Sequence, residues 1–125
     1  ALSRGAAQAT FVESDPRAAG TIRANAAALG LSDRAVVVRA RVEQAVAASP
    51  PVPYQVIFAD PPYGLADTDA DDLVRALADQ PWMAAGGVLV VERRTGGPRP
   101  AWPGPLFPQR ARRYGEGTLW YGRRP

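Results

Sequence analysis

The ten residues VIFADPPYGL, numbered 56 to 65, decide how the rest of the chain is interpreted. The four apolar residues 56–59 predict a strand buried on both faces, and the two prolines must end it because proline cannot donate a ladder hydrogen bond. A carboxylate, a rigid turn and an aromatic ring thus follow the carboxyl end of a strand, where open α/β sheets bind their ligands. The stretch predicts an α/β fold with a functional site at Asp60.

Strand and helix patterns alternate on both sides of this stretch. Asp15 before Pro16 is typical of a helix cap followed by proline at the first helical position, and Gly30 suits the end of that helix. Two short runs around a glycine-containing turn at 115–117 predict a C-terminal antiparallel hairpin. The alternation predicts parallel strands joined by helical crossovers. The expected strands are 9–14, 35–38, 55–59 and 87–92, and the expected helices are 16–29, 42–49 and one around 73–77.

The composition narrows the chemistry that the chain can perform. With 125 residues and 46% hydrophobic content, we expect one domain over residues 1–125. The absence of cysteine and histidine excludes thiol nucleophiles, disulfides, histidine acid/base chemistry and the usual zinc ligand sets, so no metal is expected. A membrane span needs roughly 18 consecutive apolar residues, and the sequence has no run of that length. We therefore expect a soluble, cytoplasmic protein.

Positive charge is concentrated near the C-terminus. Residues 93–125 hold eight arginines against the single acid Glu116, whereas residues 1–92 hold seven arginines against eleven acids. This asymmetry favours a polyanionic partner such as a nucleic acid, with a merely solvated basic edge as the alternative. Arg110, Arg112 and Arg113 on the expected hairpin are the candidate phosphate contacts.

Several motifs together resemble one enzyme class. Glu13 after the first strand, FADPPYG at 58–64, MAAGGVLVVE at 83–92 and the closing hairpin are similar to a class I S-adenosylmethionine-dependent methyltransferase. The pattern is closest to the small-subunit ribosomal RNA guanine-N2 methyltransferase family. The resemblance implies a Rossmann-like, mostly parallel sheet, S-adenosyl-L-methionine as cofactor, and ribosomal RNA or the small ribosomal subunit as partner. It also implies a protein that is monomeric when complete.

The turn after the strand suits methylation of an exocyclic amine. Such an amine is a poor nucleophile because its lone pair is delocalised into the base. The Asp60 carboxylate and the carbonyl of Pro61, held at a fixed angle by the double proline Pro61-Pro62, can accept its N–H groups and return electron density to nitrogen. Tyr63 offers a ring on which the base can stack. The target nucleotide should be flipped out or unpaired to reach this turn.

The resemblance also implies the residues that bind the cofactor. Glu13, with Ser14 beside it, would accept the ribose hydroxyls, and Arg41 and Val42 would contact the adenine through backbone N–H and apolar packing. Asp60 would border the same site. Two alternatives remain open from the residues: a DNA adenine-N6 or cytosine-N4 methyltransferase, and a non-catalytic or NAD-type Rossmann domain that uses the proline turn only as a turn.

The beginning of the chain is expected to be incomplete relative to that family. The resemblance implies that the first strand and the glycine-rich cofactor loop lie upstream of Ala1. We therefore expect the strands at 9–13 and 55–59 to be separated by a gap of roughly two strand spacings, or to have collapsed onto each other. The 125 residues alone are then expected to be poorly soluble and inactive.

Overall fold

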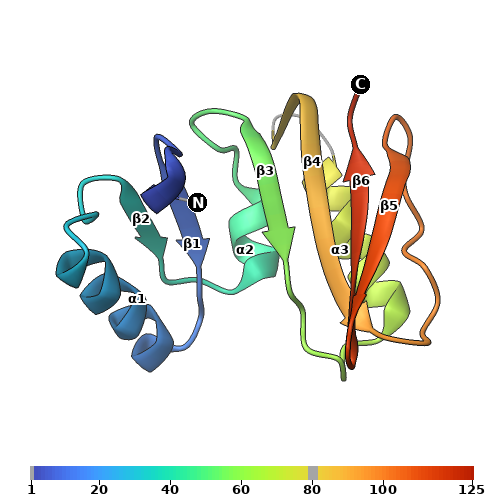
Figure 1. Cartoon of the computed structure of the whole chain (residues 1–125), viewed down its shortest axis with the longest axis horizontal. Helices are drawn as coiled ribbons and strands as arrows, with labels where there is room; N and C mark the ends of the chain where they lie inside the picture. Colours follow the sequence, from blue (N-terminus) through green and yellow to red (C-terminus); the bar gives the residue numbers. More distant parts are fainter. Residues whose placement is uncertain (1, 79–81) are drawn as a thin grey trace. The chain divides into compact units, whose positions relative to one another are not determined.

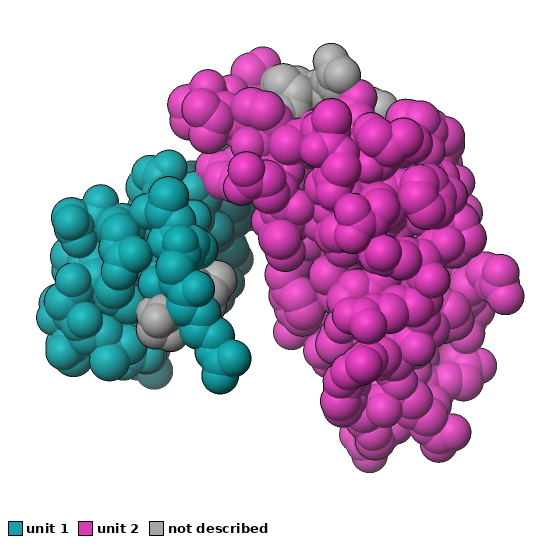
Figure 2. Space-filling model, turned by 45° about the horizontal axis from the view of Figure 1, so that its top comes forward, with its two compact units in different colours: residues 1–48 teal, residues 49–125 magenta. Residues whose placement is uncertain are grey.

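The chain folds into two compact units. A computed structural model describes residues 2–78 and 82–125 (Figure 1). The units are Ala1–Ala48 and Ser49–Pro125, coloured separately in Figure 2. The first contains a two-stranded sheet and the second a four-stranded sheet. That residues 1–125 form one domain stays a prediction.

The first unit is a strand, helix, strand, helix segment. Its strands pair in parallel, and the Asp15 carboxylate accepts a hydrogen bond from the Arg17 amide at 3.1 Å, which satisfies one free N–H at the start of the following helix. Gly30, with φ of +68°, provides the left-handed residue after that helix. Both helix-boundary predictions are confirmed. The elements are a 3-10 helix at Leu2–Arg4, β1 (Ala9–Val12), α1 (Pro16–Ala28), β2 (Ala35–Val38) and α2 (Val42–Ala47).

The second unit is a mixed sheet with a helix on one face. Its order is β3-β4-β6-β5, with β3 parallel to β4 and the other pairs antiparallel. The predicted α/β class and C-terminal hairpin are confirmed, although the strand predicted at 87–92 is longer. The elements are β3 (Tyr54–Ala59), α3 (Asp67–Ala78), β4 (Met83–Arg94), β5 (Phe107–Tyr114) and β6 (Gly117–Arg123).

The core of the second unit lies between its sheet and α3. Leu89 and Val91 of β4 and Val74 of α3 are at most 1% exposed. Trp102 covers the neighbouring strand: a Cβ added at Gly122 would lie 2.5 Å from its ring. Because side chains alternate along a strand, Leu89, Val91 and the next odd residue, Arg93, share this side, called here the α3 face.

The prediction that the strand at 56–59 is buried on both faces is wrong for the second unit. Val56 is 66% exposed and Phe58 is 56% exposed, whereas Ala59 is buried. The register pairs Val56 with Val88 and Phe58 with Val90, which places these side chains on the face opposite α3. β3 is also an edge strand of its sheet, so it has a neighbour on one side only.

The strands expected to flank a gap belong to different units. Among the described residues, β1 is hydrogen-bonded to β2 and β3 to β4, so β1 and β3 do not form a ladder with each other. The predicted gap stays a prediction. None of the helices in residues 2–78 and 82–125 has the length and apolar character that a membrane span requires.

Candidate functional site

The Asp60–Tyr63 turn leaves the sheet at the carboxyl end of β3. The last register pair joins Ala59 to Val91, so continuing the parallel pairing by one residue brings Asp60 beside Glu92 at the carboxyl ends of two neighbouring strands. Asp60 is exposed and Pro61 is buried. The turn therefore presents a carboxylate to solvent on a backbone that is anchored in the protein.

Two acceptors of this turn have no partner in the part of the protein that the structure describes. Within the described ranges, neither the Asp60 carboxylate nor the Pro61 carbonyl makes a hydrogen bond. The Pro62 carbonyl, by contrast, accepts from the Leu65 amide at 3.0 Å and from Arg93 Nη1 at 3.0 Å. The predicted pair of acceptors for an amine is thus available, while the neighbouring carbonyl is engaged.

Tyr63 is held by groups from β4 and β6. Its hydroxyl donates to Glu92 Oε2 at 3.1 Å, and the Arg94 guanidinium lies 6.0 Å from the ring centroid. A Cβ added at Gly117 would lie 2.6 Å from the Tyr63 hydroxyl, a distance that real contacts do not tolerate. Glycine at 117 therefore allows the half-buried ring to lie where it does.

Loss of hydration and one neighbouring charge change the protonation of Asp60. Loss of hydration raises the pKa of the Asp60 carboxyl, and repulsion from Glu92 raises it further. Loss of hydration and the hydrogen bond to Glu92 likewise raise the pKa of Tyr63, so its hydroxyl stays protonated and donating at neutral pH. The site combines a carboxylate that binds a proton more readily than usual with a neutral aromatic ring.

We expect Glu92→Gln to move the acid limb of the activity profile to lower pH. An amine acceptor must be ionised, and removing the Glu92 charge lowers the pKa of Asp60, so ionised Asp60 persists to lower pH. Glutamine still accepts from Tyr63. The measurement is kcat/KM against pH for both proteins, with Asp69→Asn, a distant acid change, as control. An unmoved limb would show that Glu92 does not act on Asp60.

The residues expected to bind the cofactor lie in the first unit. Glu13 follows β1, where its amide donates to the Val38 carbonyl at 3.0 Å; its carboxylate is half-buried and has no hydrogen-bond or ion-pair partner in the described part of the chain. Ser14 is exposed. Arg41 precedes α2 and approaches Glu43 at 3.8 Å, with both side chains exposed. The backbone N–H of Val42 lies in the first turn of that helix.

The structure does not bring the three candidate phosphate contacts together. Arg110 pairs with Tyr121 and Arg112 with Leu119, whereas Arg113 pairs with Thr118, so Arg113 lies on the α3 face and the other two lie on the opposite face. Arg110 stacks on Tyr121 at 4.5 Å. Because Leu119 pairs with Glu92, Arg112 shares a row and a face with the carboxylates at the strand ends.

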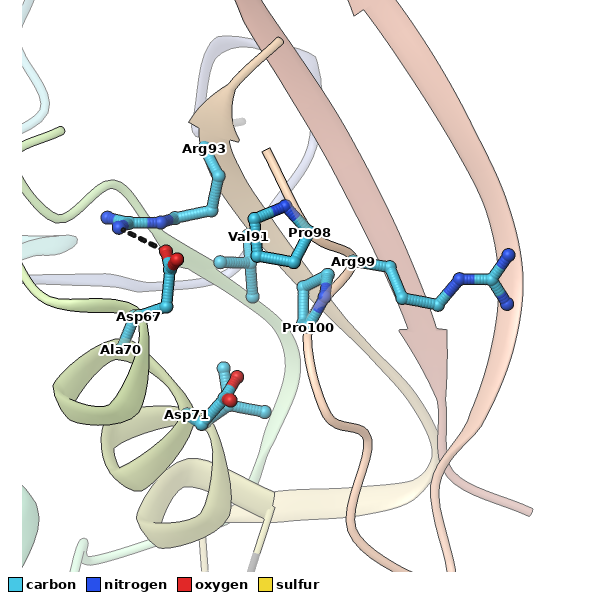
Figure 3. Close-up of a pocket in the computed structure, with 9 residues that line it drawn as sticks. Asp67, Ala70, Asp71, Val91, Arg93, Pro98, Arg99 and Pro100 are labelled. Atoms are coloured by element: carbon cyan, nitrogen blue, oxygen red, sulfur yellow. Dashed lines mark hydrogen bonds and ion pairs between the residues drawn. The ribbon is translucent and has the colours of Figure 1, made fainter. Parts of the chain in front are cut away.

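A small pocket on the α3 face lies apart from Asp60. In Figure 3, Asp67 of α3 points toward Arg93, Pro98 and Pro100 come from the loop after β4, and Arg99 extends away from the pocket. The Asp71 carboxylate accepts from the Ala101 amide at 3.1 Å, so this acid fixes the loop. No group of three or more metal-ligating residues occurs in the part of the chain that the structure describes.

Three residues of the site were not predicted from the sequence. Glu92, Arg93 and Gly117 contact the turn from 29 or more positions away in the chain. One signal was present: three adjacent charged residues, Glu92 to Arg94, follow the apolar part of a strand that runs parallel to the strand ending at Asp60. Alternation places such neighbours on opposite faces, so they reach the turn from both sides.

Comparison with known proteins places the chain among proteins named for methyl transfer. The model of a family described as "Conserved hypothetical protein 95" matches residues 1–123. A protein from Escherichia coli, provisionally named a methyltransferase, superposes with a TM-score of 0.83 and 27% identity over 98% of this chain and 66% of its own. One from Haemophilus influenzae, provisionally named a methylase, has a TM-score of 0.83 and 22% identity over 98% and 75%.

A third solved structure adds a ligand to the comparison. It is an RNA methyltransferase from Salinibacter ruber in complex with S-adenosyl-L-homocysteine, with a TM-score of 0.66 and 18% identity over 94% of this chain and 66% of its own. The chain thus spans between two thirds and three quarters of the length of these solved proteins. No curated protein matches it.

Proposed function

We propose a function on the premise that the chain belongs to the family described as "Conserved hypothetical protein 95". This membership and the solved structures confirm the resemblance to class I methyltransferases that the sequence predicts. The proposed activity is S-adenosylmethionine-dependent methylation of an exocyclic amino group of a nucleobase, guanine N2 in small-subunit ribosomal RNA. The observation that carries it is a pair of acceptors at the end of β3, Asp60 and the Pro61 carbonyl, that have no hydrogen-bond partner among residues 2–78 and 82–125.

The residues present fit S-adenosylmethionine as cofactor. The Glu13 carboxylate follows the carboxyl end of β1 without a partner among the described residues, as an acceptor for two ribose hydroxyls requires. Ser14, Arg41 and Val42 lie at the corresponding ends of β1 and β2 and are assigned to the same ligand. When bound, the cofactor supplies a methyl group on a positively charged sulfur.

The turn makes the amine reactive by accepting hydrogen bonds from its N–H groups. Asp60 and the Pro61 carbonyl each accept one such bond, which returns electron density to the nitrogen. The nitrogen would take the methyl group as the methyl–sulfur bond breaks and leaves its electron pair on sulfur. The raised pKa of Asp60 makes it a better acceptor of the proton that the nitrogen then loses. Tyr63, fixed by Glu92, stacks on the base and sets its angle.

The direct test is the modified nucleoside. Full-length enzyme and isotope-labelled S-adenosylmethionine are incubated with small ribosomal subunits from cells lacking the enzyme, with protein-free ribosomal RNA and with duplex DNA. We expect labelled N2-methylguanosine in the RNA, identified by mass spectrometry after digestion. Labelled N6-methyladenine or N4-methylcytosine in DNA would favour the DNA enzyme, and binding of NAD in place of S-adenosylmethionine would favour the non-catalytic alternative.

We expect Arg110 and Arg112, but not Arg113, to contact RNA phosphates. The first two share the sheet face of Glu92, and Arg112 is about three strand spacings, roughly 14 Å, from Asp60 along one row. Arg110→Gln with Arg112→Gln should reduce the slope of log K against log salt by about 0.7 to 0.9 per lost contact, without changing the base that is methylated. Arg113→Gln is the matched control. An equal effect of Arg113→Gln would refute the proposed face.

A further inference from the structure

Arg93 is a buried charge beside the proposed site. It is 8% exposed and is the only charged residue among the buried residues of the described ranges. Its neighbour Glu92 lies on the opposite face of β4, because adjacent strand residues point to opposite sides. Burying an arginine is costly unless its donors are satisfied, so the contacts it makes explain its presence.

Arg93 makes three polar contacts with the described residues, and two of them are to the backbone after Asp60. Nη1 donates to the Pro62 carbonyl at 3.0 Å, and Nη2 donates to the Leu65 carbonyl at 2.8 Å and to Asp67 Oδ1 at 3.2 Å. Figure 3 shows the guanidinium directed at Asp67 at the start of α3. The Asp67 side chain is 60% exposed, so this ion pair is partly solvated and contributes little alone. The main contacts of Arg93 are therefore the hydrogen bonds to the Pro62 and Leu65 carbonyls.

We propose that Arg93 is a positioning residue that sets the angle of the Pro61 carbonyl, the second acceptor of the amine. The proposal rests on the proposed function. The ring of Pro62 fixes its φ, and the hydrogen bond from Arg93 to the Pro62 carbonyl restrains its ψ. Because the peptide bond between Pro61 and Pro62 is planar, restraining both angles of Pro62 also restrains the direction of the Pro61 carbonyl relative to β4.

The planar fork of arginine is required for this role. Its two terminal nitrogens reach acceptors on different residues at once, whereas a lysine ammonium is a single point that cannot span the Pro62 and Leu65 carbonyls in the same way. Arg93→Lys keeps the charge and most of the volume, so it tests the geometry of the contacts. Arg93→Ala removes the contacts and leaves a cavity of the shape of a guanidinium.

The experiment measures three quantities in the full-length enzyme: turnover, the affinity for the cofactor, and the hydrogen-exchange protection of the Leu65 amide in the turn. Arg93→Lys and Arg93→Ala should lower kcat by about tenfold or more, because small displacements of a positioned group are costly. The dissociation constant for S-adenosylmethionine should change by less than about twofold, since Arg93 does not lie in the unit assigned to the cofactor. Methylguanidine at millimolar concentration should restore part of the turnover of Arg93→Ala and none of that of Arg93→Lys.

Two further variants separate positioning from general stability. Asp67→Ala removes the ion pair but leaves both carbonyl contacts, so its kcat should fall by no more than about threefold. Arg99→Ala, an exposed arginine bordering the same pocket, should leave kcat unchanged. A loss in Asp67→Ala equal to that in Arg93→Lys would overturn the proposal.

Hydrogen exchange separates this inference from the proposed function. The Leu65 amide donates to the Pro62 carbonyl at 3.0 Å, so its protection reports the held turn without any substrate. In Arg93→Lys we expect this protection to fall about tenfold while amides of the β4–β6 ladder keep theirs. Unchanged protection of the Leu65 amide in Arg93→Lys would overturn the proposed role of Arg93. Lost protection of this amide with an unchanged kcat would overturn it as well. A wild-type enzyme that methylates no base would instead refute the proposed function.

Discussion

Asp60→Ala should lower kcat for methyl transfer by roughly 10²-fold or more, because it removes an acceptor that acts on the amine only as charge develops on nitrogen. The affinity for S-adenosylmethionine should be nearly unchanged, since the lost contact is to the base. The measurement is single-turnover methylation of RNA together with calorimetric titration of the cofactor. Normal turnover in this variant would refute the assignment of Asp60.

Two control variants separate the effect of the position of Asp60 from the effect of its charge. Asp69→Ala removes an exposed acid in the first turn of α3 and should leave the rate unchanged. Asp60→Asn keeps an oxygen acceptor but loses the charge, so its rate should fall between those of the wild type and Asp60→Ala. Its thermal stability should not fall at neutral pH. Because the pKa of Asp60 is raised in the folded protein, the fold is stabilised while this carboxyl is protonated, and that stabilisation is lost as pH rises through the raised pKa. At neutral pH the ionised Asp60 therefore opposes folding, and asparagine, which cannot ionise, does not.

Local signals predicted the boundaries of the first long helix and the C-terminal hairpin. Asp15 and Pro16 act through contacts within one helical turn, and Gly30 through its own backbone angle, so neither depends on distant parts of the chain. The hairpin around Gly115 is equally local, since its positive φ of 60° is a property of the turn. Such features are determined by neighbours in sequence and could be predicted from them.

Burial of the strand before Asp60 depends on what covers each face. An apolar run such as residues 56–59 shows that a strand can be buried, but not which elements pack on it. α3 lies on the face of Val91, which leaves Val56 and Phe58 exposed within the second unit. The length of β4 was also underestimated, because its first residues, Met83 to Gly86, are joined to β3 through an irregular register that no local pattern reveals.

The site shows the same division between local and distant determinants. Asp60, Pro61 and Tyr63 could be named because the turn itself is unusual. The groups that orient the turn come from β4 and β6, and their roles depend on register: Glu92 lies beside Asp60, and Arg93 lies on the other face. The sequence alone also placed Arg112 and Arg113 together, although adjacent strand residues point to opposite faces.

Tyr63→Ala is expected to lower kcat/KM by about 10- to 100-fold, because base stacking on an aromatic ring contributes about 1–3 kcal/mol. Tyr63→Phe keeps the ring and loses only the hydrogen bond to Glu92, so its loss should be no more than a few fold. Measuring kcat/KM for both variants with the same RNA separates the ring from the hydroxyl. An equal loss in the two variants would mean that the hydroxyl, not stacking, is what matters.

Gly117→Ala tests the position of the ring without altering the ring. The added Cβ would lie 2.6 Å from the Tyr63 hydroxyl and 3.1 Å from Glu92 Oε2, so the tyrosine must shift while keeping its stacking face. If the base is aligned by the angle of the ring, kcat should fall by about tenfold. Gly20→Ala, where the new Cβ meets nothing within 4 Å, is the control. Undiminished turnover in Gly117→Ala would show that the ring supplies only surface, and that alignment comes from Asp60 and the Pro61 carbonyl alone.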